Sequence, residues 1–428
     1  MRLSIISLLI INFFAVADSV LKLALEESLD ELMPKVIEWR HDIHQHPELA
    51  NREFRTSKKV ADHLISFGLE VETGVAYTGV VALIEGGSPG PTVAVRADMD
   101  ALPVTEKTGL PFASTVRTTY LGNDVGVMHA CGHDAHVSIL MGVAEFLVKN
   151  KDKLKGNVLL IFQPAEEGPP EDEGGGAKMM LEEGIFERYN PEAIFGLHVT
   201  NMPNGYIAIK PGPALAAASA YRITIKGVQT HGSTPWSGID PIMATSQLIE
   251  ALNTIVSRRI NIINNPAVVS VGMVDAGTRN NIIPDEAMLM GTIRTYDPEL
   301  RKEIYEEIEQ IARGIAVGTG TEVKVEFDVG GFYPVTVNDK DLTAKLQSSL
   351  LEAPATGAEA FSYFSREIPG VFFWLGVNKP GVGLDSTNFG ASSEAAPNHS
   401  PYFFVHDDAL DEGVRGLTYL VADYLSSE

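Results

Sequence analysis

The segment 129–136, His-Ala-Cys-Gly-His-Asp-Ala-His, limits most strongly what this chain can fold into. It contains the only cysteine and three of the eleven histidines of the chain. Cys131 and His133 are two residues apart, so both side chains point to the same side if the segment is extended. A thiolate and an imidazole that converge on one point suit a zinc-type ion. An isolated Cys-x-His pair is more often a buried cysteine beside surface histidines, but the further histidines and the aspartate of this segment favour a metal site.

Two aspartates follow an apolar strand that we expect over Thr92–Arg96. Asp98 and Asp100 come directly after this strand, and in open α/β sheets functional groups gather beyond the carboxyl ends of the strands. They can be metal ligands, they can orient ligand histidines, or they can cap the next turn. We favour the second interpretation.

Two further apolar strands also end in polar residues. The strand Asn157–Phe162 leads to Glu166 and Glu167, and adjacent side chains point in different directions in extended backbone. One carboxylate can therefore bind a metal while the other faces the substrate as a base. A solvated turn is the alternative, which the all-apolar strand disfavours. His198 lies at the end of the strand Ala193–Val199 and is interpreted as a metal ligand rather than as a packed core histidine.

The first residues of the chain predict an export signal, residues 1–17. Arg2 precedes a nearly unbroken apolar run that ends in Ala15-Val16-Ala17, an A-x-A cleavage pattern. The run is short for a membrane span. We therefore expect cleavage before Asp18 and a secreted or periplasmic protein, with a retained membrane anchor as the alternative. The single cysteine of an exported chain forms no internal disulfide.

The charge of the chain restricts its partners. The formal net charge is −23, and removal of Arg2 with the signal makes it more negative. This balance argues against nucleic acids and anionic membranes as partners. With 45% hydrophobic and 21% charged residues, the remainder has the composition of a soluble globular protein.

The length and the order of the expected elements predict two domains. A chain of 428 residues is too long for one hydrophobic core. Residues 213–329 follow the order strand, helix, strand, strand, helix, strand, which predicts a small α+β sandwich. This sandwich is inserted into an α/β domain of residues 18–212 and 330–428, in which a mixed sheet has helices on both faces. Glycine and proline at the borders suit hinges, so the inserted domain is expected to act as a lid.

A group of histidines follows the first expected helix. Leucines and valine at helical spacing predict this helix from Val20 to about Trp39. The spacing of His41, His44 and His46 forms no compact set of metal ligands. We therefore interpret this segment as a helix end with polar contacts, closed by the following proline.

Several motifs, in order, resemble one family. MHACGHDAH, FQPAEEG, FGLHV and the late NHSP look like the M20 metallopeptidase clan. The branch is that of the amidohydrolases, which includes hippurate hydrolases, N-acyl-amino-acid amidohydrolases and plant auxin-conjugate hydrolases. RHDIHQHPELANREFRTS, RADMDALPV, THGSTP, NIIPDEAMLMGTIRT and GAEAFSYF are similar to the same branch. The likeness extends from about Glu31 to Leu425.

The resemblance implies a role for individual residues. Glu166 matches the catalytic glutamate, and Asp98 and Asp100 match the acidic turn beside the metals. His231 matches a histidine that helps to hold the substrate carbonyl and, in dimeric relatives, reaches the active site of the partner subunit. Two further positions match polar groups associated with the substrate carboxylate, Asn281 and Arg294. Five residues match the ligands of a two-metal site: Cys131, His133, Glu167, His198 and His399.

One position departs from the family pattern. Relatives usually have Glu-Asp where this chain has Glu359-Ala360. The change removes no expected metal ligand, but it puts the shape of the acyl pocket, and hence the substrate, in doubt.

These features together predict a metal-dependent amidohydrolase that cleaves N-acyl-amino acids, hippurate-like or similar conjugates, to a carboxylic acid and an amino acid. Two divalent ions are expected, zinc or manganese, with cobalt as a third option. One alternative is a dipeptidase or carboxypeptidase-like exopeptidase with the same site. Another is a metal-binding protein without catalysis, which the retained Glu166 argues against. By resemblance the chain is expected to form a homodimer through the inserted domain.

Overall fold

The computed structural model describes residues 12–170, 173–263, 265–346, 359–378 and 396–427. The chain forms two compact units. The first holds the residues up to Gly212, a short stretch after Val337, and the chain from Tyr363 onward. The second holds Pro213–Thr336 and a short segment that ends at Ser362. Most of the predicted export signal lies outside the described residues.

The first unit is built on a seven-stranded mixed sheet with the order β1-β2-β6-β3-β7-β17-β8. The neighbours β6, β3, β7 and β17 run parallel, so their carboxyl ends meet at one edge. The outer pairs are antiparallel, which confirms the predicted mixed sheet. The strands are β1 (Val71–Val75), β2 (Gly79–Glu85), β3 (Ser88–Asp98), β6 (Lys155–Gln163), β7 (Ala193–Thr200), β8 (Ile207–Ala208) and β17 (Gly370–Gly376).

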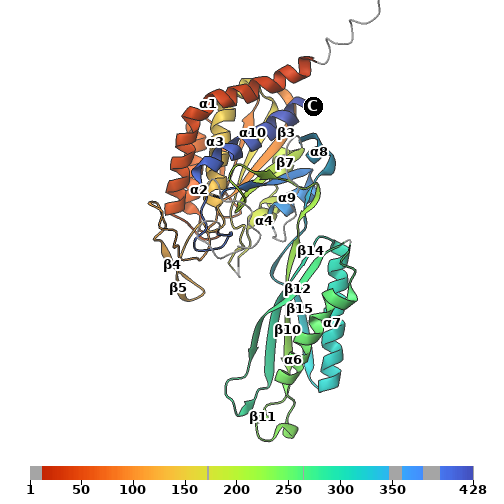
Figure 1. The fold of residues 1–428 in the computed structure, drawn as a ribbon. Coiled ribbons are helices and arrows are strands. Elements are labelled where there is room, and N and C mark those ends of the chain that lie inside the picture. The colour runs from red at the N-terminus through yellow and green to blue at the C-terminus, as the bar shows by residue number, and fades with distance from the viewer. Residues whose placement is uncertain (1–11, 171–172, 264, 347–358, 379–395, 428) are drawn as a thin grey trace, which may run out of the picture. The chain divides into compact units, whose positions relative to one another are not determined.

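Helices lie on both faces of this sheet, as predicted (Figure 1). The central helix α3 is buried on nearly every side, because it packs against the sheet, against the long helix α1 and against α10, which itself contacts the sheet. The predicted apolar positions of α1, from Leu21 to Val36, are buried in the same core. The helices are α1 (Asn12–Gln45), α2 (Phe54–Ser66), α3 (His133–Lys149), α4 (Gly176–Glu182), α5 (Ile185–Tyr189), α8 (Lys340–Leu346), α9 (Phe361–Glu367) and α10 (Leu410–Ser427). A small hairpin, β4 (Arg117–Tyr120) and β5 (Asn123–Gly126), precedes α3.

The second unit is a four-stranded antiparallel sheet with the order β12-β14-β10-β15. Two helices pack on it and share its core (Figure 1). Both helices begin with Asp-Pro, in which Asp240 or Asp297 accepts two backbone N–H bonds and proline takes the first turn. Six elements follow the predicted order: β10 (Ala217–Lys226), α6 (Pro241–Leu252), β12 (Ala267–Ala276), β14 (Glu286–Thr295), α7 (Pro298–Thr319) and β15 (Glu322–Tyr333). Two short strands that pair with each other, β11 (Thr230–His231) and β13 (Ile282–Ile283), were not predicted. Strands β9 (Gly212–Leu215) and β16 (Thr336–Asn338) lie where the chain enters and leaves it.

Among the described residues, no helix combines the length and the hydrophobicity needed to cross a bilayer.

The end of α1 is held by a buried polar network. The helix continues to Gln45, past the predicted end at Trp39, and turns its polar residues inward. Arg40 Nε donates to Asp134 Oδ2 at 3.1 Å, and Arg40 NH1 donates to Asp407 Oδ1 at 2.6 Å. His44 lies between Asp134, at 2.9 Å, and Glu106, at 3.2 Å. These bonds confirm the interpretation of this segment as a helix end with polar contacts.

His44 makes the stability of the fold depend on pH. Burial disfavours its charged form, but Asp134 and Glu106 outweigh burial and raise the pKa of His44 to about 9, above the value of about 6.5 in an unfolded chain. Its contribution is therefore complete below about pH 6.5 and is lost as the pH rises through about 9. We expect the difference in unfolding free energy between the wild type and His44→Gln to shrink between pH 6 and pH 10. Urea unfolding at several pH values measures it, and a constant or growing difference would contradict the assignment.

Candidate metal centre

Cys131 and His133 are brought together by a turn. The segment is not extended as we expected: Gly132 has φ +88° and α3 begins at His133. A Cβ atom at Gly132 would lie 2.3 Å from Val199 Cγ2, so this turn requires glycine both for its backbone conformation and for its contact with β7. The thiol and the imidazole thus lie at the start of a buried helix, beside the carboxyl end of β7.

Two groups of candidate ligands share Cys131. Its sulfur lies 3.3 Å from His198 Nε2 and 3.2 Å from His399 Nε2. His399 Nε2 also lies 3.2 Å from Glu167 Oε1. The potential ligand atoms of each group lie within 4.8 Å of one another. The two groups are Cys131, His133 and His198, and Cys131, Glu167 and His399. All five expected ligands are therefore close together, and the thiol lies where the groups meet.

The segment that carries His399 is tied to the cysteine turn by its backbone. His399 N donates to Ala130 O at 2.7 Å. Asn398 Nδ2 donates to Cys131 O at 3.1 Å and to Val199 O at 3.0 Å. His399 itself has φ +69°, a left-handed conformation that side chains other than glycine rarely adopt. These contacts bring a residue from the far end of the sequence to the sulfur.

Backbone hydrogen bonds determine which ring nitrogens are available to a metal. His198 Nδ1 donates to Val199 O at 2.7 Å, which leaves Nε2 free to act as a ligand. His136 differs, because the Val199 amide donates to its Nε2 at 2.9 Å. His136 Nδ1 therefore carries the proton and donates to Asp98 Oδ1 at 2.6 Å. Asp98, His133 and His136 also lie close enough to form a group, but both nitrogens of His136 are already used, so we do not count it as a ligand.

The residues present fit a divalent cation. His133 has no exposed surface, and neither of its ring nitrogens makes a hydrogen bond within the described part of the chain, although Nδ1 lies 3.3 Å from Asp100 Oδ1. Burial and the Glu167 carboxylate raise the pKa of the Cys131 thiol well above its usual range. A thiolate at this position therefore needs a positive charge beside it, and a metal ion supplies one.

The two glutamates are held by a tight turn. Ala165 has φ +48°, and the Glu166 and Glu167 amides donate to the two oxygens of Asp100, each at 2.9 Å. Glu53 Oε1 accepts from the Ala165 amide at 2.9 Å. Asp100 therefore contacts the backbone of the two glutamates. Asp98 accepts a hydrogen bond from His136 and forms an ion pair with Arg96 at 2.9 Å. The structure thus places Asp98 and Asp100 against the ligand-bearing segments. The histidine that Asp98 bonds is His136, and Asp98 Oδ2 lies 3.6 Å from Nε2 of the expected ligand His133.

Sequence reasoning missed Glu53. It directly precedes the amphipathic helix α2, where a glutamate usually indicates no more than a polar helix start. In the structure its side chain makes no cap of α2 and points to Ala165 instead. No local pattern in the sequence distinguishes these two roles.

Within the second unit, His231 and Asn281 are neighbours. His231 pairs with Ile282, and Gly232 N donates to Asn281 O at 2.9 Å. The Ser233 amide donates to His231 Nδ1 at 3.0 Å, so the proton of the neutral ring lies on Nε2. The exposed imidazole therefore offers one N–H donor.

Arg294 lies away from this pair. Arg294 lies on β14 opposite Ala218 of β10. At the other end of these two strands Lys226 pairs with Glu286, and the chain continues from Lys226 to β11. Eight residues of strand correspond to roughly 26 Å. The structure does not bring Arg294 together with His231 in one chain.

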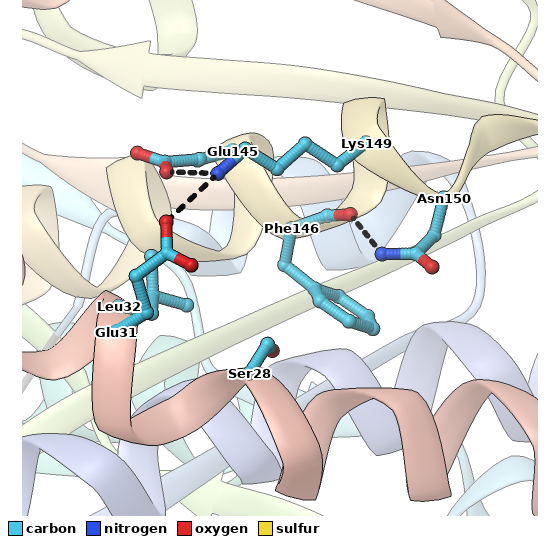
Figure 2. A pocket seen from close by; sticks show the side chains of 7 residues that line it. All are labelled: Ser28, Glu31, Leu32, Glu145, Phe146, Lys149 and Asn150. Carbon is cyan, nitrogen blue, oxygen red and sulfur yellow. Dashed lines mark hydrogen bonds and ion pairs between the residues drawn. The ribbon is translucent and has the colours of Figure 1, made fainter.

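A small pocket of about 100 Å³ between α1 and α3 is separate from these groups. Its charged side chains pair with each other: Lys149 lies 2.7 Å from Glu145 and 3.7 Å from Glu31 (Figure 2). Lys35 lies 2.7 Å from Glu145 and 3.5 Å from Glu31, so two cations balance the two carboxylates. None of the predicted site residues lines the pocket.

Comparison with known proteins identifies the family. Residues 94–423 match the model of peptidase family M20/M25/M40. The chain belongs to this family. Thermostable carboxypeptidase 1 of Saccharolobus solfataricus is 41% identical and is matched over 94% of this chain and 98% of its own length. N-acetylcysteine deacetylase of Bacillus subtilis is 40% identical over 80% of this chain and 88% of its own. IAA-amino acid hydrolase ILR1-like 4 of Arabidopsis thaliana is 36% identical over 90% and 84%.

Solved structures agree with this assignment. A putative aminohydrolase from methicillin-resistant Staphylococcus aureus has a TM-score of 0.81 at 33% identity, with 94% of this chain and all of that chain covered. A dinuclear metal-binding peptidase of the M20 family from Bacillus subtilis has a TM-score of 0.75 at 33% identity, with 93% of this chain and 100% of that chain covered. The M20 protein described here is a metal-dependent amidohydrolase, as its sequence predicted.

The hydrogen bonds of the two neighbouring histidines predict different effects of mutation. His133→Gln removes a ligand and is expected to lower the number of metal ions bound per chain. His136→Gln removes only an outer contact, so it is expected to weaken affinity by about 10- to 100-fold while full occupancy is still reached at high metal concentration. Metal analysis across a concentration series measures both. Equal loss of binding sites in the two variants would show that His136 is a ligand.

Proposed function

We propose that the M20 protein hydrolyses the amide bond of N-acyl-amino acids, with two divalent ions and Glu166 as the proton carrier. The observation that carries this proposal is the turn at 165–167. It gives Glu167 to one ligand group and keeps the adjacent Glu166 within reach of His133 and Glu167. A site that only stored metal would need no second buried carboxylate there.

The proposed ligands are Cys131, His133, Glu167, His198 and His399. Ions held by these residues would supply a water of lowered pKa and would polarise the substrate carbonyl. Glu166 then takes the proton of the attacking water and passes it to the leaving amine nitrogen. Thiolate and imidazole ligands favour zinc, and the carboxylate also accepts manganese or cobalt.

The substrate class is supported by the names of the relatives. They include deacetylases of N-acetylated amino acids and hydrolases of IAA-amino acids, which all release an amino acid from an amide. Two carboxypeptidases are somewhat more similar, each with 41% identity, so the exopeptidase alternative has to be tested as well. A panel of hippurate, N-acetyl-amino acids, an indoleacetyl-amino acid and free dipeptides separates the two. The proposal expects cleavage of the acylated compounds, and cleavage of dipeptides alone would replace it by the exopeptidase.

The role of Glu166 is tested by Glu166→Gln. The variant keeps the shape of the side chain but cannot accept a proton, so kcat is expected to fall by about 10²- to 10⁴-fold. Metal content is expected to stay at the wild-type level, because the five ligands are untouched. Turnover near the wild-type rate in fully loaded protein would remove Glu166 from this role.

We further propose that the active form is a homodimer joined through the second unit. His231 and Asn281 lie at one end of its sheet and Arg294 at the other, so one small substrate cannot contact all three from the same chain. Two copies resolve this separation if His231 of one chain serves the site of the other. There its Nε2–H would donate to the carbonyl oxygen as negative charge develops, and Arg294 would bind the amino-acid carboxylate.

Mixed dimers test this arrangement. Glu166→Gln and His231→Ala proteins are each expected to be nearly inactive. After subunit exchange, each hybrid dimer contains one site in which both Glu166 and His231 are intact. At equal mixing about half of the dimers are hybrids, so about a quarter of the wild-type activity is expected. Exchange is monitored by native mass spectrometry. No recovery despite proven exchange would show that His231 acts within its own chain.

A further inference from the structure

We propose that Glu53 is a positioning residue for the pair Glu166-Glu167. Its buried carboxylate and that of Asp100 together hold three successive backbone amides, and this sets the direction of the two glutamates. The inference rests on the proposed function, in which Glu166 carries the proton and Glu167 binds a metal.

The three amides bond to side chains from other segments of the chain. Ala165 N donates to Glu53 Oε1, Glu166 N to Asp100 Oδ1, and Glu167 N to Asp100 Oδ2, each at 2.9 Å. Ala165 is buried and has a left-handed backbone, which an alanine rarely adopts without support from its surroundings. The conformation that separates the two glutamate side chains therefore depends on acceptors from other segments.

Glu53 is built into this position. It has no exposed surface, and its second oxygen accepts from Thr78 Oγ1 at 2.5 Å. Each oxygen of the carboxylate thus has one donor, one from the catalytic turn and one from the loop before β2. The two hydrogen bonds fix the position of the Glu53 side chain, which in turn restrains the backbone of Ala165.

The residues next to Glu53 hold the other end of the same loop. Asn51 Nδ2 donates to Gly174 O at 2.8 Å, and Arg52 NH2 donates to Glu173 Oε1 at 2.6 Å. Asn51 is itself buried and left-handed, with φ +59°. The loop that begins at Ala165 is therefore tied at both ends to residues 51–53.

The chemistry of the contact identifies the variant that should preserve it. Burial and the Asp100 carboxylate raise the pKa of Glu53 to about 7, so the position does not require a permanent negative charge. A glutamine at this position can still accept from Ala165 N and donate to Thr78. An alanine can do neither, and an aspartate is one methylene too short to reach both partners.

The test compares steady-state kinetics of Glu53→Ala, Glu53→Asp and Glu53→Gln at saturating metal, normalised to folded and metal-loaded protein. Misplacement of a reacting group by about 1 Å costs about 10²-fold, so kcat of Glu53→Ala and Glu53→Asp is expected to fall by about that factor. KM is expected to change little, because Glu53 does not touch the substrate. The kcat of Glu53→Gln is expected to stay within about threefold of the wild-type kcat, because glutamine keeps both hydrogen bonds.

Glu145→Ala is the matched control. Glu145 is also a buried glutamate with two strong partners, Lys35 and Lys149, but it lies on α3 away from the turn. Its removal is expected to lower stability and to leave kcat unchanged. If Glu53→Ala does not fold, the comparison of Glu53→Asp with Glu53→Gln still decides, since only the former is expected to lose kcat.

Several outcomes would overturn the inference. They are a wild-type kcat in Glu53→Ala or Glu53→Asp, an equal loss in Glu53→Gln, or a change in KM alone. Glu166→Gln is measured in parallel. If it retains turnover, the proposed function fails; if it is inactive while Glu53→Ala is active, only the role of Glu53 fails.

Discussion

A single thiol links the parts of this site. Cys131 belongs to both groups of candidate ligands, and its burial raises the thiol pKa, so a thiolate there depends on bound cations. The other four ligands lie on separate segments that meet at Cys131. They are at the start of α3, in the turn after β6, at the end of β7 and in the segment before α10. Because β6, β3 and β7 are parallel neighbours, their carboxyl ends meet where the thiol lies.

Carboxylates surround these ligands and hold their geometry. Asp98 fixes the proton of His136, whose other nitrogen accepts from the Val199 amide. Asp100 fixes the backbone of the two glutamates. On the far side of α3, Asp134 joins its first turn to Arg40 and His44 of α1. The start of α3 is thus anchored on both sides of the ligand His133, which limits how far a ligand can drift from its geometry.

The main features of fold and site could be predicted because they depend on local patterns. Apolar strands followed by polar residues placed Asp98, Glu166, Glu167 and His198 at one edge of a sheet, and the alternation and spacing of apolar residues gave the order of elements in the second unit. Helix ends were less accurate: α1 continues to Gln45 rather than ending at the predicted Trp39, since the polar residues of its last turns gave no apolar periodicity to follow.

Other features depend on contacts between distant segments, which periodicity does not encode. The bond from Ala165 to Glu53 joins residues 112 positions apart. The turn at Gly132 follows from the close approach of Val199, and the left-handed backbone of Ala165 and His399 has no signal in the identity of those residues. The positions of His231 and Arg294 at opposite ends of one sheet likewise become visible only once the strand register is known.

The most direct test of this account is a crystal structure of the metal-loaded protein with anomalous diffraction data collected at the absorption edge of the bound metal. The account predicts two peaks, both beside Cys131 Sγ, at about 2.3 Å for zinc. One should also lie against His133 and His198, and the other against Glu167 and His399. Peaks that do not involve Cys131, or a metal held by His136, would contradict it.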